Sequence, residues 1–154
     1  MNFSQLANHR ILDQPIYQPG KPIEQVALEY NLDINEICKL ASNENPWGAS
    51  PKAIEAGKKS LENIHLYPEG SGFKLRAKIA SLQKIDPNQI ILGNGSNEII
   101  ELLGHVFLDT EDEVLVGQHA FVVYKLTALL MGARPVVVPM PNLVHYLNNC
   151  RGAV

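Results

Sequence analysis

Few features of this sequence point to a membrane, a nucleic acid or a metal. The chain has 154 residues and a net charge of -3, so it lacks the basic excess that nucleic-acid binding needs. No apolar run approaches the roughly 18 residues that span a bilayer, and the first residues lack the apolar segment of a signal peptide. The only two cysteines, Cys38 and Cys150, stand far apart, which predicts free thiols in a reducing cytoplasm. The five histidines show no metal-ligand spacing. We therefore expect a cytoplasmic protein with no membrane, nucleic-acid or metal partner.

Strands and helices alternate in the second half of the chain. Apolar β-rich runs at 90–92, 114–117 and 135–138 are separated by helical patterns at 97–108 and 121–131. This alternation predicts an α/β fold with a parallel sheet that helices cover on both faces. Three short strands make a thin sheet with open edges, which is an aggregation hazard. We therefore expect a fragment of a larger α/β protein, or the product of a truncated reading frame.

The first half of the chain predicts isolated elements between turns. Prolines and a glycine make residues 1–22 irregular, and Pro22 then suits the start of a helix. Further predictions are a short strand at 37–40, a loop at 41–49, a helix at 51–61, a loop at 67–72, and a helix that contains Leu75, Ile79 and Leu82. A last helix is expected to begin at 143 and to run to 151.

The most informative segment is Gly93-Asn94-Gly95-Ser96-Asn97-Glu98, which joins an apolar run to an amphipathic helix. Glycines let a backbone approach a ligand closely, and a helix N-terminus offers unpaired N–H groups and a positive dipole end. The segment therefore predicts a cup for a phosphate or another anion, although glycine can also serve turn geometry alone. A dinucleotide fingerprint would require glycine in place of Glu98, and no Gly-Lys-Ser/Thr of a Walker loop occurs.

An aromatic segment, His119-Ala120-Phe121-Val122-Val123-Tyr124, follows the second predicted strand. Ligands of open parallel sheets bind at the carboxyl ends of strands, so an aromatic ring there suggests a planar group stacked near the anion cup. The alternative is that Phe121 and Tyr124 belong to the core face of a helix. Periodicity favours the core for Tyr124 and leaves both interpretations open for Phe121.

Four segments in this order resemble one enzyme family. They are Tyr17-Gln18-Pro19-Gly20-Lys21-Pro22, Leu40-Ala41-Ser42-Asn43-Glu44-Asn45-Pro46-Trp47-Gly48, Tyr67-Pro68-Glu69-Gly70-Ser71-Gly72, and the 93–98 loop with the leucine before it. The chain resembles, from about residue 17 to its end, the N-terminal part of pyridoxal-phosphate-dependent aminotransferases of the aspartate-aminotransferase fold. Within that group it most resembles histidinol-phosphate aminotransferases.

The resemblance implies an α/β fold: an incomplete three-layer large domain of a fold-type I pyridoxal-phosphate enzyme, with a mostly parallel sheet and an N-terminal arm. Residues 1–45 would form the arm and a small-domain segment, and residues 46–154 the first part of the cofactor-binding large domain. The family's strand order is not sequential. The run at 90–92 would therefore not pair directly with the strand at 114–117.

The resemblance also implies site residues. Gly95, Ser96 and Asn97 would hold the phosphate of pyridoxal 5'-phosphate, and Phe121 would stack on its pyridine ring. Tyr67 would reach the cofactor phosphate of the neighbouring subunit of a homodimer. Tyr17 and Asn45 would line the pocket of a small-molecule substrate. His119-Ala120 replaces the family's usual Pro-Thr, so the loop before the stacking ring departs from the family pattern.

The implied reaction moves an amino group between glutamate and imidazole-acetol phosphate in histidine biosynthesis. The family's Schiff-base lysine and its partner residues come later in the sequence, and none of the nine lysines here matches the lysine motif. No catalytic residue is therefore assigned, and the chain is expected to be inactive alone. The alternatives are a non-catalytic truncated product, or a fragment of a related aromatic or other amino-acid aminotransferase.

Overall fold

A computed structural model describes residues 5–12 and 14–145 of the chain. The helices are α1 His9–Leu12, α2 Ile23–Tyr30, α3 Pro51–Ser60, α4 Phe73–Gln83, α5 Ser96–Phe107 and α6 Val122–Met131, and the strands are β1 Glu113–Gly117 and β2 Arg134–Val138. Short 3-10 helices lie at η2 Ile34–Glu36, η3 Leu61–Asn63, η4 Pro87–Gln89 and η5 Pro141–Leu143. No helix in the described part of the chain is long and apolar enough to cross a membrane.

The chain divides into two compact units, each described by itself below. Unit 1 combines residues 1–16 with 72–154, and unit 2 contains residues 17–71. The boundary that the resemblance implies, between residues 45 and 46, is a division of another kind and stays a prediction.

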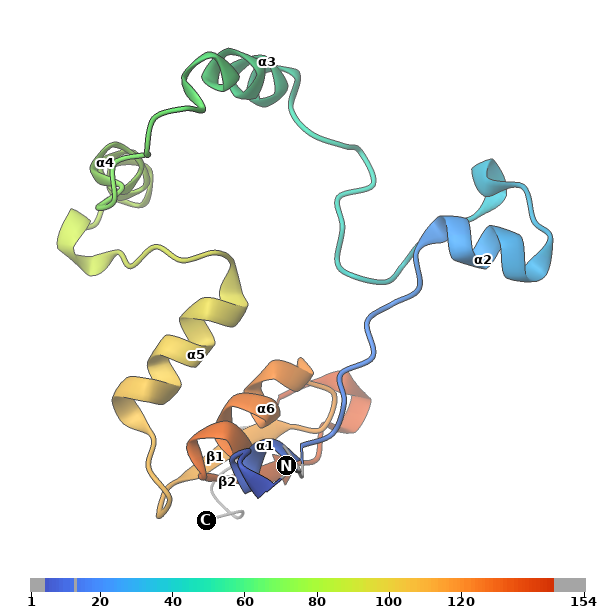
Figure 1. Ribbon diagram of the computed structural model, residues 1–154, viewed down its shortest axis with the longest axis vertical. Helices are drawn as coiled ribbons and strands as arrows, with labels where there is room; N and C mark the ends of the chain where they lie inside the picture. Colours follow the sequence, from blue (N-terminus) through green and yellow to red (C-terminus); the bar gives the residue numbers. More distant parts are fainter. Residues whose placement is uncertain (1–4, 13, 146–154) are drawn as a thin grey trace. The chain divides into compact units, whose positions relative to one another are not determined.

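Unit 1 is built around a parallel pair of strands (Figure 1). β1 and β2 pair in register from Glu113 opposite Arg134 to Gly117 opposite Val138, and α6 is the crossover between them. The Arg134 guanidinium forms an ion pair with the Glu113 carboxylate at the start of the pair. Gln118 donates its backbone N–H to the carbonyl of Val138 at 2.8 Å, which extends the pairing beyond the last strand residues. The predicted strands at 114–117 and 135–138 and the helix between them are confirmed.

Close packing of α5 on α6 depends on small residues. Gly104 of α5 is buried, and a Cβ placed on it would lie 2.6 Å from Cγ2 of Thr127 and 3.3 Å from Cγ of Met131. Besides Gly104, the buried residues in the described part of unit 1 are small or of medium size: Ala80, Val116, Thr127, Ala128, Ala133, Val138 and Met140. A core of this kind removes little apolar surface from water per residue.

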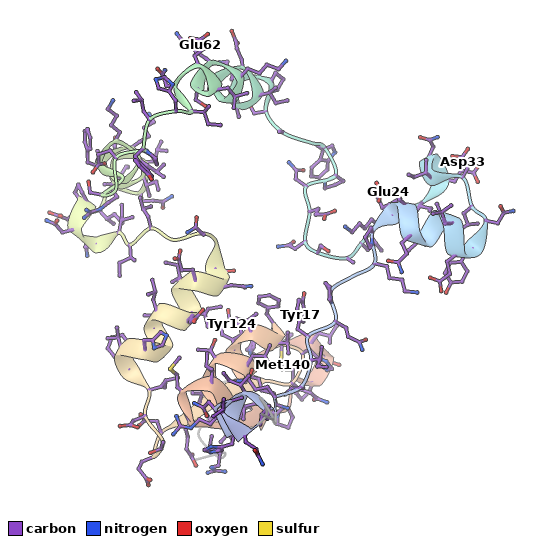
Figure 2. The ribbon with its side chains drawn as sticks, in the orientation of Figure 1. Tyr17, Glu24, Asp33, Glu62, Tyr124 and Met140 are labelled. Atoms are coloured by element: carbon purple, nitrogen blue, oxygen red, sulfur yellow. The ribbon has the colours of Figure 1, made fainter. Side chains whose placement is uncertain are left out.

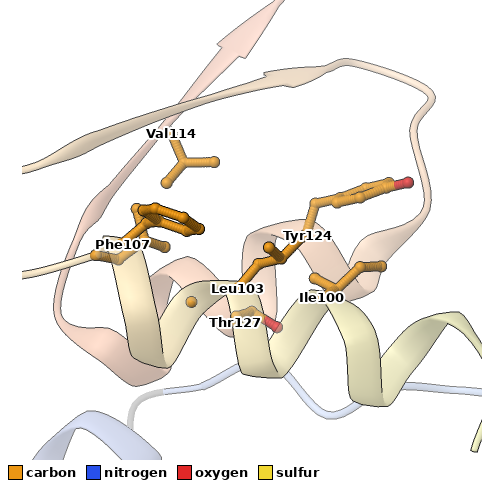
Figure 3. A pocket seen from close by; sticks show the side chains of 8 residues that line it. Ile100, Leu103, Phe107, Val114, Tyr124 and Thr127 are labelled. Carbon is orange, nitrogen blue, oxygen red and sulfur yellow. The ribbon is translucent and has the colours of Figure 1, made fainter. Parts of the chain in front are cut away.

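The core of unit 1 is incomplete. An apolar cavity of about 260 Å³ lies between α5, α6 and β1, lined among others by Ile100, Leu103 and Tyr124 (Figure 3). On the sheet, Leu115 is 39% exposed and Val137 is 52% exposed. These strand side chains stay partly exposed because the described elements of unit 1 make only part of a domain, which is consistent with the expected incomplete three-layer large domain.

The N-terminal arm contains a helix that the sequence did not predict. Residues 1–22 were expected to be irregular, but α1 packs on α6. The Arg10 guanidinium donates to the carbonyl of Met131 at 3.1 Å, and the Gln14 amide donates to the carbonyl of Leu126 at 3.3 Å. A Cβ on Gly132, which has φ of +86°, would lie 2.7 Å from Cζ of Arg10. Long-range contacts therefore hold α1, and a sequence pattern does not reveal them.

Unit 2 contains helices and turns without a buried core. The helices predicted after Pro22 and Ser50 are present as α2 and α3, and none of their residues is buried. The turn between α2 and η2 is capped by Asp33, whose carboxylate accepts the backbone N–H of Asn35 at 2.9 Å; Asp33 and Glu24 of α2 are labelled in Figure 2. The predicted strand at 37–40 is wrong, because that segment has no partner strand.

Two further predicted elements differ from the structure. The run at 90–92 is extended at Ile90 but is not a strand, because no neighbouring strand pairs with it. The last predicted helix does not begin at 143, since Leu143 ends η5 and the next two residues are not helical; its continuation from 146 lies outside the described residues. Cys38 is an exposed free thiol, and Cys150 also lies outside the described residues.

Replacing Gly104 with valine should destabilise unit 1. The side chain must displace Thr127 and Met131, and overpacking of this kind costs about 1–3 kcal/mol. Urea unfolding followed by circular dichroism measures the loss. Gly57→Ala in α3 is the control, because no atom lies within 4 Å of its Cβ position and alanine favours a helix interior by about 0.5–1 kcal/mol. Equal midpoints for wild type and Gly104→Val would contradict the close packing of α5 on α6.

Candidate functional site: an anion cup at the start of a helix

The 93–98 loop changes from extended chain to helix within three residues. Gly95 is the N-cap of α5, with φ of +84° and ψ of 178°, a conformation that is essentially restricted to glycine. No atom lies within 4 Å of the position a Cβ would take there, so this side of the backbone is open. Ser96 and Asn97 follow as the first two helical residues. The helix begins one residue earlier than predicted, and Asn94 and Gly95 precede it, as an anion cup requires.

The N–H groups of the cup are available to a ligand. The N–H groups of the first helical residues have no carbonyl partner within their own helix. Gly95, Ser96 and Asn97 are exposed, and their N–H groups donate to no other residue in the described part of the chain. The positive end of the α5 dipole adds to this arrangement. Backbone donors and dipole together favour an anion at this position.

The loop is supported by close contacts on both sides. A Cβ on Gly93 would lie 2.8 Å from Cδ1 of Ile99 and 2.9 Å from Oε2 of Glu98, so only glycine fits between the chain and the first turn of α5. A Cβ on Gly72, which has φ of +60°, would lie 2.4 Å from Cδ1 of Leu92. Within unit 1, Gly72 therefore contacts Leu92, the residue before the cup.

Glu98 makes a contact within this loop that was not predicted from the sequence. Its carboxylate accepts the backbone N–H of Asn94, and it also accepts the Asn94 side-chain amide at 3.2 Å. Glu98 is the third helical residue, the position at which a glutamate reaches back to the chain before a helix. That spacing was visible in the sequence and could have predicted the contact.

Phe121 lies after β1, as predicted. The chain turns after Gly117, whose carbonyl accepts the N–H of Ala120 at 2.9 Å, and Phe121 is the N-cap of α6. The backbone N–H of His119 points to the sulfur of Met140 at 3.5 Å, so the His119-Ala120 departure from the family pattern is accommodated in a tight turn. The Phe121 side chain is 42% exposed. Its stacking role stays a prediction.

The other predicted site residues belong to unit 2. Asn45 shapes its own loop: its amide donates to the carbonyl of Gly48 at 2.8 Å, and its Oδ1 accepts the N–H of Trp47 at 3.2 Å. Tyr17 is half exposed and Tyr67 is fully exposed. Both tyrosines are therefore accessible, and their roles and that of Asn45 stay predictions.

Neither a metal site nor an activated lysine stands out in the described residues. No group of three or more His, Cys, Asp or Glu side chains there could hold a metal ion. All nine lysines are described; eight are exposed, and Lys39 is half-buried and paired with Glu44 at 2.8 Å. Among the described residues, the 93–98 loop at the start of α5 is consequently the candidate functional site.

Comparison with known proteins identifies close relatives in sequence. No model of a protein family matches the chain. The chain is 44% identical to histidinol-phosphate aminotransferase 2 of Nitrosospira multiformis over 154 residues, which are 100% of this chain and 39% of that protein. It is also 44% identical to the histidinol-phosphate aminotransferase of Akkermansia muciniphila over 139 residues, 90% of this chain and 38% of that protein. The chain thus spans about two fifths of the length of these relatives.

Solved structures share the fold. A histidinol-phosphate aminotransferase from Sinorhizobium meliloti, in complex with pyridoxal 5'-phosphate, matches 84% of this chain and 34% of its own with a TM-score of 0.70 and 17% identity. An aspartate aminotransferase from Thermotoga maritima matches 96% of this chain and 42% of its own with a TM-score of 0.72 and 22% identity.

The sequence relatives and the solved structures both agree with the α/β architecture described above. At these identities the structural matches establish the fold alone, and they confirm the α/β class and the incomplete large domain of the aspartate-aminotransferase fold. The sequence matches confirm the resemblance along the whole chain. In sequence, this chain is similar along its whole length to about two fifths of the histidinol-phosphate aminotransferases named above, and it shares its fold with aminotransferases of known structure.

Proposed function

We propose that the 93–98 loop holds the phosphate of pyridoxal 5'-phosphate. Supporting this are the open side of Gly95 and the free N–H groups of Ser96 and Asn97 at the positive end of α5. The chemistry of the donors fits a dianion, because backbone N–H groups at a helix start donate without bringing a competing acceptor. The hydroxyl of Ser96 supplies a further donor. When bound, this cofactor supplies an electron sink for amino-group transfer.

We further propose that the complete protein transfers an amino group between glutamate and imidazole-acetol phosphate in histidine biosynthesis. The observation that carries this proposal is the 44% identity to histidinol-phosphate aminotransferases along the entire chain. Within this chain, Phe121 would hold the cofactor ring by stacking, and Tyr17 and Asn45 would orient the substrate. These residues bind and position, and no residue of this chain is assigned the proton transfers.

The assembly that we propose is a homodimer in which Tyr67 reaches the phosphate held by the neighbouring subunit. The fully exposed side chain of Tyr67 supports this role, since its hydroxyl is accessible to another molecule. Tyrosine suits such a contact because an apolar ring carries one polar end.

Replacing Gly95 with alanine should weaken binding of pyridoxal 5'-phosphate about tenfold. A side chain is strained in the backbone conformation of Gly95 by about 1–3 kcal/mol, and it would enter the open side of the cup. Isothermal titration of the chain with the cofactor measures the change. Gly48→Ala is the matched control, because Gly48 also has positive φ (+75°) and open space around it. If both variants bind like wild type, the cup is not where the phosphate binds.

The 154-residue chain alone should form no specific covalent adduct with the cofactor. Covalent catalysis needs a lysine that its surroundings activate and hold at the cofactor, and eight of the nine lysines are exposed side chains. Borohydride reduction followed by peptide mass spectrometry should show no single labelled lysine, and glutamate should donate no amino group. A full-length histidinol-phosphate aminotransferase serves as the positive control. One specifically labelled lysine together with turnover would refute the prediction.

Tyr67→Phe should weaken cofactor binding only where the chain is dimeric. Loss of one hydroxyl donor to a charged acceptor costs about 1.5–3 kcal/mol, or roughly ten- to a hundredfold in affinity. Affinity is measured at chain concentrations below and above the dimerisation midpoint found by sedimentation. An equal loss in monomer and dimer would show that Tyr67 acts within its own chain.

A further inference from the structure

Glu98 connects the first turn of α5 to the chain before the cup. Its Oε2 accepts two N–H groups of one residue, the backbone N–H and the side-chain amide of Asn94. The same oxygen lies 2.9 Å from the position a Cβ would take on Gly93. One carboxylate oxygen therefore holds Asn94 through two hydrogen bonds and leaves no room for a side chain on Gly93. Hydrogen bonds to a charged acceptor are stronger than neutral ones.

This contact leaves the cup itself open. Asn94 precedes Gly95, whereas the N–H groups that would receive an anion belong to Gly95, Ser96 and Asn97 and have no acceptor among the described residues. Glu98 consequently does not take the place of the ligand. Glu98 instead binds Asn94, which lies between Gly93 and Gly95. Because glycine has the greatest backbone freedom of any residue, a fixed Asn94 restricts the conformations of the loop on both sides.

Two effects of Glu98 on an incoming phosphate oppose each other. Its negative charge repels a dianion at the same helix end. Its hold on Asn94 fixes the loop in advance, and a site that is already ordered loses less conformational entropy on binding. Because Glu98 is half-buried against the loop and directed to Asn94, the ordering effect should outweigh the repulsion.

We infer that Glu98 is a positioning residue that orders the anion cup through Asn94. This inference rests on the proposed function of the loop. It predicts that the acceptor oxygen of Glu98, and not its charge, is needed for phosphate binding. Glutamine at position 98 retains a carbonyl oxygen that can accept both N–H groups of Asn94, whereas alanine retains none.

The test compares Glu98→Ala and Glu98→Gln in the 154-residue chain, at a temperature where each variant is folded. Two quantities are measured: the NMR resonance of the Asn94 backbone amide without ligand, and the affinity for pyridoxal 5'-phosphate and for inorganic phosphate, with pyridoxal as the probe that lacks a phosphate. Glu101→Ala is the control, because Glu101 is an exposed glutamate of the same helix. Its Oε1 lies 3.8 Å from Nε2 of His105, and it makes no contact with Asn94 among the interactions of the described residues.

Glu98→Ala should displace the Asn94 resonance and weaken binding of both phosphate probes about tenfold, whereas Glu98→Gln should stay within about twofold of wild type or bind more tightly. Tighter binding by Glu98→Ala would show that charge repulsion dominates, and unchanged binding would show a helix cap without influence on the cup; either result overturns the inference. If wild type keeps the Asn94 contact but binds neither phosphate probe, the proposed function fails instead, and the Asn94 resonances still decide whether Glu98 orders the loop.

Discussion

The parallel pairing of β1 with β2 is the interaction on which the described structure of unit 1 depends. Parallel strands require a crossover, and here the crossover is α6, whose packing partners are both strands, α5 and α1. Gly104 lets α5 approach α6, and Arg10 reaches the end of α6 beside Gly132. Elements of this unit that lie far apart in sequence thus pack on one helix, α6. The 93–98 loop begins α5, so the packing of α5 on α6 also positions this loop.

Local patterns in the sequence predicted most of the elements whose formation needs few partners. The helices after Pro22 and Ser50, the helix after the glycine cup and the strand–helix–strand unit at the end of the described chain are all present. A proline or a glycine fixes the ends of many of these elements through backbone geometry alone. Elements that depend on distant residues were predicted less well: 37–40 and 90–92 lack partner strands, and α1 forms against α6.

In the candidate site, too, contacts between residues close in sequence were predictable, and contacts between distant residues were not. Gly95, Ser96 and Asn97 are consecutive, so their sequence alone indicated a cup, and the structure gives Gly95 the backbone conformation that only glycine tolerates. The contact of Glu98 with Asn94 spans one helical turn and could have been inferred from spacing. The contact between Gly72 and Leu92 joins two segments twenty residues apart in the chain, and spacing could not have predicted it.

A division of labour between phosphate binding and catalysis follows from these local constraints. An anion cup can be built from a few consecutive residues, because its donors are backbone N–H groups and its field comes from a single helix. Amino-group transfer requires side chains with different tasks to converge on one small group, and such convergence comes from residues far apart in the chain. A chain that spans about two fifths of the length of its relatives can therefore contain all the residues of the proposed phosphate site, whereas eight of its nine lysines are simply exposed. In such a chain the order of the loop, set by Glu98 and the flanking glycines, is the property of the site that depends on these residues alone.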